Sequence, residues 1–266
     1  MWTPLRAWRG RKSCSKFGVR NSEPGFSLNF SVGLRFARMK ARRILHGALV
    51  CAAAMWAAGP AAASERVQPR SEAMWEDALA AFAAADLMNA PEPGGVLFVG
   101  SSSIRLWDSL ESDFADAPVI KRGFGGSRLS DCVRLMDRLV IKYRPRIVML
   151  YAGDNDLAEG STPEEVLERV KAFAEGVHRR LPETRIRFIS IKPSPARQSL
   201  LERARAANRL VQEYAASHPA LDYVDVFTPM LTAEGTPRSE LFRADALHLN
   251  DAGYALWRAV LRPFVR

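Results

Sequence analysis

Residues 96–107 read VLFVGSSSIRLW, in which four consecutive apolar side chains are followed by a glycine and three serines. A continuous apolar run of this kind is typical of a strand that is buried on both faces of a parallel sheet. Serines that directly follow a strand are good caps for the next helix. The segment therefore predicts a buried parallel strand with polar side chains at its carboxyl end.

Strand and helix patterns alternate on both sides of this segment. Further strands are expected at 119–120, 147–151, 185–191 and 223–226, and helices at 71–90, 129–143, 200–217 and 251–261. The sequence at 162–165 is a capping box with proline at the first helical position, and it opens another helix with an apolar side. Strands that alternate with helices predict an α/β fold whose five-stranded parallel sheet is covered on both faces.

The basic charge of the chain is concentrated at its N-terminal end. The formal net charge is +9, but residues 1–63 hold eleven Lys or Arg and one acid, which leaves 27 basic and 28 acidic side chains from Ser64 onward. Binding to a phosphate backbone needs a basic surface on the folded part of a protein. The charge distribution therefore argues against a nucleic-acid partner.

Residues 39–63 have the organisation of a secretory signal peptide. A basic head at 40–43 precedes an apolar stretch at 44–58, and three alanines at 61–63 provide a cleavage site. The apolar stretch is short for a bilayer span, so we expect an exported protein, periplasmic or secreted, with no stable membrane span after cleavage. Residues 1–38 are interpreted as a non-native or disordered extension upstream of the true start.

Cysteine usage argues against a disulfide framework and against a cysteine metal site. Cys14 and Cys51 precede the predicted cleavage point, so only Cys132 remains in the mature chain. Its position in an amphipathic helical pattern predicts a small buried side chain.

Polar residues gather where the predicted strands end. Residues 100–103, 123–127 and 153–156 follow the first three strands, and 245–248 lie in the loop before the last helix. Taken singly, these segments have ordinary explanations as helix caps, tight turns and a loop histidine. Because the carboxyl ends of parallel strands meet at one edge of a sheet, their joint occurrence favours a functional site there.

These residue types meet the needs of acyl transfer. A serine hydroxyl such as that of Ser102 becomes a nucleophile when a base, here His248, takes its proton. Asp245, three residues before the histidine, is placed to fix the tautomer of the imidazole and to stabilise its charged form. The developing oxyanion needs donors, for which the backbone N–H groups of Ser102 and Gly126 and the side-chain amide of Asn155 are candidates.

Four segments resemble the conserved blocks of the SGNH hydrolases, also called GDSL-like lipases and acylhydrolases. They are VLFVGSSSIRLW (96–107), KRGFGGSRL (121–129), YAGDNDL (151–157) and DALHLN (245–250), in the family's order. The resemblance implies a flavodoxin-like three-layer α/β/α fold and no metal or organic cofactor. It also implies that Ser102 is the nucleophile, His248 the base and Asp245 the residue that orients it. We therefore expect an esterase domain at 95–266, preceded by a helix and linker at 64–94.

One position departs from the family pattern. Ser101 stands where the family usually has aspartate, so three serines are consecutive. Alignment on Gly100 selects Ser102 as the nucleophile, whereas a slip of one residue selects Ser101 or Ser103. Loss of the usual carboxylate is expected to alter local hydrogen bonding and to lower activity.

Three functions compete on this sequence. The first is an exported serine ester hydrolase, lysophospholipase- or acetylesterase-like, that acts as a monomer on small-molecule esters such as acylated sugars, aryl esters or lysolipids. The second is an exported O-acyltransferase that uses the same triad on glycans. The third is a non-catalytic glycan- or lipid-binding module, against which the complete set of four blocks argues. Short connections and the lack of a long apolar lid favour small or single-chain acyl groups.

Overall fold

The structure, a computed structural model, describes residues 72–266. The predicted extension at 1–38, the predicted signal peptide at 39–63 and the first part of the predicted helix and linker at 64–94 lie outside these residues. No helix between residues 72 and 266 combines the length and apolar character that crossing a bilayer requires.

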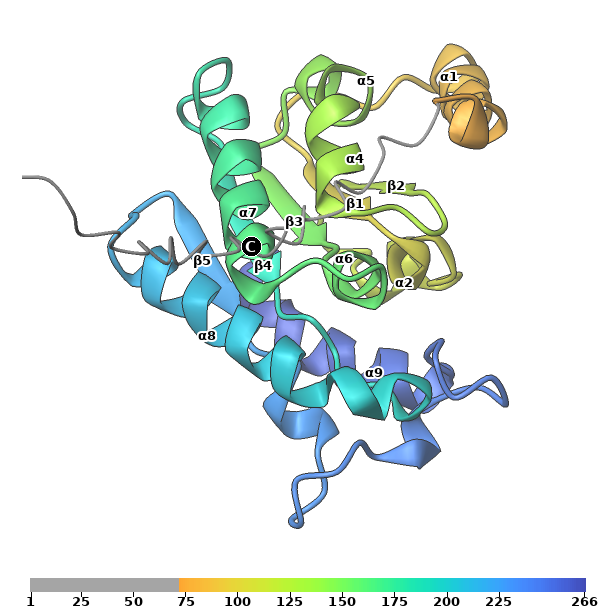
Figure 1. The fold of residues 1–266 in the computed structure, drawn as a ribbon. Coiled ribbons are helices and arrows are strands. Elements are labelled where there is room, and N and C mark those ends of the chain that lie inside the picture. Colours follow the sequence, from red (N-terminus) through yellow and green to blue (C-terminus); the bar gives the residue numbers. More distant parts are fainter. Residues whose placement is uncertain (1–71) are drawn as a thin grey trace, which may run out of the picture. The chain divides into compact units, whose positions relative to one another are not determined.

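The described part of the chain is built around a five-stranded sheet in which every pair of neighbours is parallel (Figure 1). Its strands are β1 (Val96–Gly100), β2 (Val119–Gly123), β3 (Ile147–Tyr151), β4 (Arg185–Ile189) and β5 (Leu221–Val224). The order across the sheet is β2-β1-β3-β4-β5, which places β1 between β2 and β3. The predicted parallel α/β fold is confirmed.

Apolar side chains fill both faces of the sheet. Leu97 and Val99 of β1 belong to one buried core, whereas Val96 and Phe98, which point the other way, belong to a second core. All four side chains are fully buried. This two-sided burial is the physical reason for the continuous apolar run in the sequence.

Helices cover both faces and complete three layers. The longer ones are α1 (Glu76–Met88), α7 (Pro163–His178), α8 (Leu201–Ala216) and α9 (Asp251–Leu261). Short helices are α2 (Ser102–Arg105), α3 (Leu110–Asp113), α4 (Leu129–Arg134), α5 (Met136–Leu139) and α6 (Asp154–Ala158), with 3₁₀ turns η1 (Glu72–Trp75), η2 (Ile141–Tyr143), η3 (Pro195–Leu200), η4 (Thr228–Met230), η5 (Ser239–Leu241) and η6 (Arg262–Phe264). Residues of α1, α4, α5, α7 and α8 line the first core, and residues of α2, α3 and α9 line the second.

Local sequence signals explain where α7 begins. The Thr162 hydroxyl accepts a hydrogen bond from the Glu165 N–H at 3.2 Å, and the Glu165 carboxylate accepts one from the Thr162 N–H at 2.8 Å. The predicted capping box is therefore confirmed. Asn250 likewise caps α9 through a 3.0 Å bond from the Gly253 N–H to its side-chain oxygen.

Two expectations about helices were wrong. The helix expected at 129–143 is divided into α4, α5 and η2, with a break at Leu135, whose φ of −94° and ψ of 12° are not helical. Its apolar residues stay buried despite the break, so the periodicity alone could not reveal it. The spacing of apolar residues in the helix expected at 71–90 also predicts a buried Leu87, but this side chain is 89% exposed.

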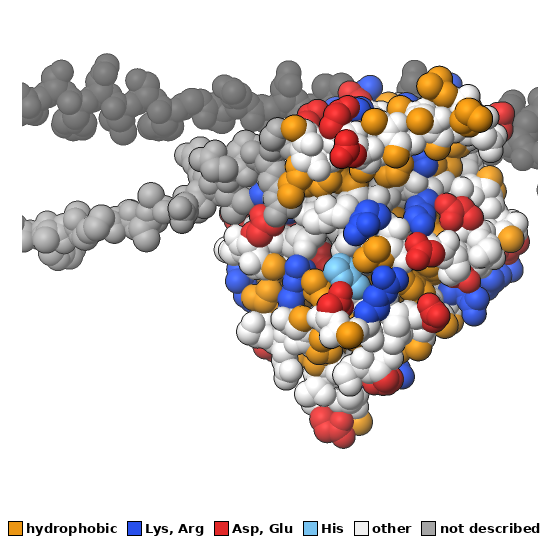
Figure 2. Space-filling view, turned by 90° about the vertical axis from the view of Figure 1, so that its right-hand side faces the viewer, with side chains coloured by type: hydrophobic (Ala, Val, Ile, Leu, Met, Phe, Trp, Pro, Cys, Tyr) orange, Lys and Arg blue, Asp and Glu red, His pale blue; other side chains and the backbone are white. Residues whose placement is uncertain are grey.

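Basic and acidic side chains are interspersed on the surface. On the face drawn in Figure 2, Lys and Arg lie among Asp and Glu, without one continuous basic area. This mixture agrees with the nearly balanced charge of the chain after residue 63.

Candidate active site

A sharp turn presents Ser102 at the carboxyl end of β1. Gly100 has a φ of +138°, and a Cβ atom there would lie 1.8 Å from the Tyr151 carbonyl oxygen, so only glycine fits. The chain then enters α2, of which Ser102 is the first residue. Ser101 and Ser103 are fully buried, whereas Ser102 is half-buried. The turn thus brings one of the three serines toward the surface.

The structure brings Ser102, His248 and Asp245 together. His248 Nε2 lies 3.1 Å from Ser102 Oγ, and His248 Nδ1 lies 2.6 Å from Asp245 Oδ2. A carboxylate on Nδ1 holds the proton of the neutral ring there and leaves Nε2 free to accept the serine proton. The three side chains therefore form one hydrogen-bonded series that ends at the serine hydroxyl.

The Asp245 carboxylate is held by its own loop. Hydrogen bonding to the His248 side chain and to the backbone N–H groups of His248 and Leu247 lowers the pKa of Asp245 well below its usual range. The two backbone bonds reach Asp245 Oδ1 at 2.9 and 3.0 Å. The carboxylate thus stays ionised over the whole range in which an imidazole titrates.

Aromatic packing fixes α9 and the preceding loop against α2. The Trp107 ring stacks on Tyr254 with centroids 5.0 Å apart and meets Trp257 edge-on at 6.1 Å. The Tyr254 hydroxyl also donates to the Ser103 carbonyl oxygen at 3.0 Å. Because Ser103 adjoins Ser102 and α9 directly follows the loop of His248, these contacts hold the serine and the histidine in a fixed relative position.

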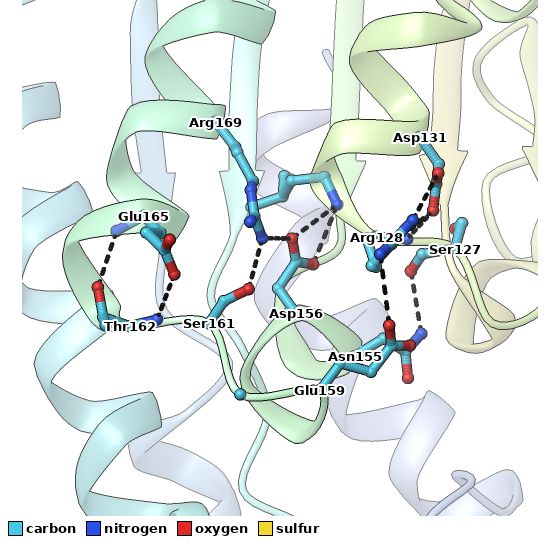
Figure 3. Close-up of polar contacts among 12 residues, drawn as sticks. Ser127, Arg128, Asp131, Asn155, Asp156, Glu159, Ser161, Thr162, Glu165 and Arg169 are labelled. Atoms are coloured by element: carbon cyan, nitrogen blue, oxygen red, sulfur yellow. Dashed lines mark hydrogen bonds and ion pairs between the residues drawn. The ribbon is translucent and has the colours of Figure 1, made fainter. Parts of the chain in front are cut away.

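Two of the three candidate oxyanion donors follow the strands on either side of β1, and the third, the Ser102 N–H, follows β1 itself. Gly126, in the turn after β2, has a φ of +74°, which agrees with the tight turn expected there. Asn155 lies in the first turn of α6, directly after β3. Its side-chain amide donates to the Ser127 carbonyl oxygen at 2.9 Å and so connects the two loops (Figure 3).

Asp156, the last residue of the Gly-Asp-Asn-Asp segment (153–156), connects parts of the fold. Its carboxylate accepts the Leu129 N–H at 3.0 Å. It also pairs with Arg169 of α7 at 2.6 Å (Figure 3). The side chain is fully buried, and this burial raises its pKa above the usual value despite the two partners. Asp156 therefore ties the loops after β2 and β3 to α7 and does not contact the triad.

A charged cluster behind Asn155 was not predicted from the sequence. The Asp154 carboxylate lies 3.0 Å from Lys192 Nζ, 3.2 Å from the Tyr151 hydroxyl and 3.3 Å from Arg197 Nη1. Burial alone would raise the pKa of Asp154, but the cations Lys192 and Arg197 and the hydrogen bonds hold it below its usual value. The available signal was a lysine and an arginine just after the fourth strand, the same edge at which the other polar residues lie.

A serine, an imidazole and a carboxylate joined by hydrogen bonds at the carboxyl edge of a parallel sheet define a class of α/β proteins with a Ser-His-Asp site. No group of three or more His, Cys, Asp or Glu between residues 72 and 266 is arranged to hold a metal ion. The chain belongs to the GDSL-like Lipase/Acylhydrolase family, which matches residues 97–256. The predicted membership of the SGNH group is therefore confirmed.

Curated relatives are similar to this chain in sequence, and solved structures are similar to it in fold. Platelet-activating factor acetylhydrolase IB subunit alpha1 from Bos taurus and from Homo sapiens are each 28% identical over 165 residues, which cover 60% of this chain and 69% and 70% of theirs. A platelet activating factor structure from Streptococcus pneumonia has a TM-score of 0.66 at 23% identity over 73% of this chain and 94% of its own. A GDSL-like lipase from Bacteroides thetaiotaomicron has a TM-score of 0.61 at 20% identity over 70% and 96%. An acetylxylan esterase from Geobacillus stearothermophilus has a TM-score of 0.51 at 14% identity over 64% and 94%.

Proposed function

We propose that this chain is a serine ester hydrolase whose nucleophile is Ser102, whose base is His248 and whose orienting carboxylate is Asp245. One observation carries the proposal: the imidazole lies 3.1 Å from the hydroxyl on one side and 2.6 Å from the carboxylate on the other. This is the hydrogen-bonded arrangement that activates serine for acyl transfer.

The reaction proceeds through an acyl-enzyme. Ser102 Oγ attacks the ester carbonyl carbon while His248 Nε2 takes the hydroxyl proton, and Asp245 stabilises the imidazolium. The carbonyl oxygen becomes an oxyanion that accepts hydrogen bonds from the backbone N–H groups of Ser102 and Gly126 and from the Asn155 amide. The tetrahedral intermediate then expels the alcohol, which receives the proton from the imidazolium. Water, deprotonated by the same imidazole, attacks the acyl-enzyme, and the acid leaves as Ser102 Oγ takes the proton back from the imidazolium.

The proposed substrates are esters with small or single-chain acyl groups. The names of relatives support short acyl groups, since the mammalian proteins are called acetylhydrolases and the Geobacillus protein an acetylxylan esterase. The connections between β1 and α2 and between β3 and α6 are too short to form a lid over the serine. We further propose that the protein is exported through the signal peptide expected at 39–63 and works without a cofactor.

Hydrolysis of p-nitrophenyl esters of increasing acyl length tests this function. We expect turnover of the acetyl and butyryl esters, and a loss of about 10⁴-fold or more in Ser102→Ala and in His248→Ala. The buried neighbours provide matched controls, because Ser101→Ala and Ser103→Ala each remove one hydroxyl of the same serine run and are expected to keep most activity. Full activity in Ser102→Ala would refute the assignment of the nucleophile. Analysis of products with and without an added sugar acceptor separates hydrolysis from acyl transfer.

A further inference from the structure

Arg197 contacts the amide that we assign to the oxyanion site. It lies in η3, in the connection after β4, and its Nη2 donates to the side-chain oxygen of Asn155 at 2.9 Å. Its side chain is 22% exposed, so the guanidinium is largely shielded from water. The bond joins residues 42 positions apart in the chain. It therefore exists only in the assembled site.

The two ends of the Asn155 side chain face partners of opposite kinds. Arg197 is a hydrogen-bond donor without acceptor capacity, and the Ser127 carbonyl, 2.9 Å from the amide nitrogen, accepts only. A flipped amide would set oxygen against the Ser127 oxygen and its NH₂ group against the guanidinium. Asn155 is thus held in one orientation, with one amide N–H on Ser127 and a second N–H left to donate.

Arg197 is itself held from two sides. Its Nη1 lies 3.3 Å from the carboxylate of Asp154, which is also paired with Lys192. The preceding residue, Ala196, donates its N–H to the carbonyl oxygen of Ala246, between Asp245 and His248, at 3.0 Å. Residues 196 and 197 thus contact both the loop of the acid–base pair and the amide of the proposed oxyanion donor.

We propose that Arg197 is a positioning residue that fixes and polarises the Asn155 amide for the oxyanion, an inference that rests on the proposed ester hydrolysis. A hydrogen bond from a cation to an amide oxygen draws electron density from the nitrogen and makes its N–H a stronger donor. The oxyanion carries full charge only near the transition state, so this effect acts on turnover more than on substrate binding.

Steady-state kinetics of Arg197→Met test this role. We expect kcat to fall by about 10- to 100-fold and KM to change by no more than about 2-fold. The loss of kcat should not exceed the loss in Asn155→Ala, which removes the donor itself. The variant should fold, because Asp154 keeps Lys192 as its partner, and urea unfolding checks this. Arg209→Met, which removes an exposed arginine paired with Glu213 on α8, is the matched control and should keep wild-type kinetics. Added guanidinium should restore part of the kcat of Arg197→Ala.

A double-mutant cycle separates positioning from direct contact with substrate. If Arg197 acts through Asn155, then Asn155→Ala combined with Arg197→Met should have the same kcat as Asn155→Ala alone. Multiplicative losses in the double variant, or a raised KM with unchanged kcat in Arg197→Met, would overturn the proposal and place the guanidinium on the substrate.

An NMR measurement makes the outcome independent of turnover. The ¹H–¹⁵N signals of the Asn155 side-chain amide, assigned by their loss in Asn155→Ala, should shift in Arg197→Met and stay nearly unchanged in Ser102→Ala. Unshifted signals in Arg197→Met would overturn the positioning role even in an active hydrolase. If the wild-type protein cleaves no ester, but the Asn155 signals still shift in Arg197→Met, only the proposed function is refuted.

Discussion

Replacing Asp154 with asparagine removes the carboxylate that two cations share and leaves the buried Lys192 without the counter-charge that it contacts. In the native protein the Lys192 side chain is 1% exposed and its ammonium lies 3.0 Å from Asp154. Breaking a buried pair by removing one partner is strongly destabilising, because the remaining charge keeps its desolvation penalty and loses its compensation.

The size of the effect is bounded by the ability of Lys192 to lose its proton. Its ordinary pKa is 10.5, and burial already lowers the pKa in the native protein. A pH of 7 lies roughly 3.5 units below the ordinary pKa of lysine, and keeping the amine neutral costs about 1.36 kcal/mol for each unit. Loss of the proton therefore limits the cost of the unpaired Lys192 to about 4.8 kcal/mol. We therefore expect Asp154→Asn to lower the free energy of unfolding by about 3–5 kcal/mol at pH 7.

This penalty should decrease as the pH rises. A lysine whose folded pKa is lowered releases its proton more readily in the folded state, so the folded state gains stability relative to the unfolded state between the folded pKa and 10.5. At pH 9 the same limit is about 2 kcal/mol. The difference between wild type and Asp154→Asn should therefore shrink from pH 7 to pH 9.

Urea unfolding of wild type and variant at both pH values measures the difference. The melting temperature at pH 7 should fall by roughly 6–20 °C. Glu213→Gln, which breaks an exposed pair with Arg209, is the control and should cost no more than about 0.5 kcal/mol. Adding Lys192→Met to Asp154→Asn should recover most of the loss. A penalty below 1 kcal/mol at pH 7, or one that does not decrease by pH 9, would refute the reasoning.

Three further predictions concern the turn, the triad and the core. Gly100→Ala should prevent stable folding or lower the free energy of unfolding by more than about 4 kcal/mol, because the added Cβ would lie 1.8 Å from the Tyr151 carbonyl oxygen. Soluble yield and thermal melting measure this, and near-native stability would contradict it. Asp245→Asn should lower kcat by up to about 10⁴-fold with little change in KM, since the imidazole loses its orienting carboxylate; ester kinetics with unchanged kcat would exclude that role. Phe173→Ala, at a fully buried position of α7, should cost about 3–5 kcal/mol in urea unfolding, and a loss below 1 kcal/mol would contradict the packing argument.

The central strand and the edge of the site could be predicted from the sequence because local patterns determine them. Four apolar residues in β1 are buried on both faces, and the polar segments follow strands whose parallel direction brings their ends together. Strand β2 was only partly recognised, since it continues through Lys121 and Arg122 to Gly123. Arg122 is buried there because Asp86 and Tyr143 provide partners, which no local pattern discloses.

The cluster behind Asn155 could not be predicted for a similar reason. Arg197 meets Asn155 across 42 residues, and Lys192 meets Asp154 across 38. Such contacts depend on the path of the connection after β4, where the chain has no periodic signal. Arg197 also has non-helical backbone angles within η3, a local feature that residue propensities do not determine.

The separation of Ser102 from His248 along the chain has a consequence for when the protein becomes active. The two side chains that share a proton are 146 positions apart, and the imidazole comes second. A polypeptide that emerges N-terminus first from the ribosome therefore contains the Ser102 hydroxyl well before the His248 imidazole is made. The proposed ester cleavage therefore requires a chain that has folded as far as the loop before α9, and a chain that ends before residue 248 should lack it.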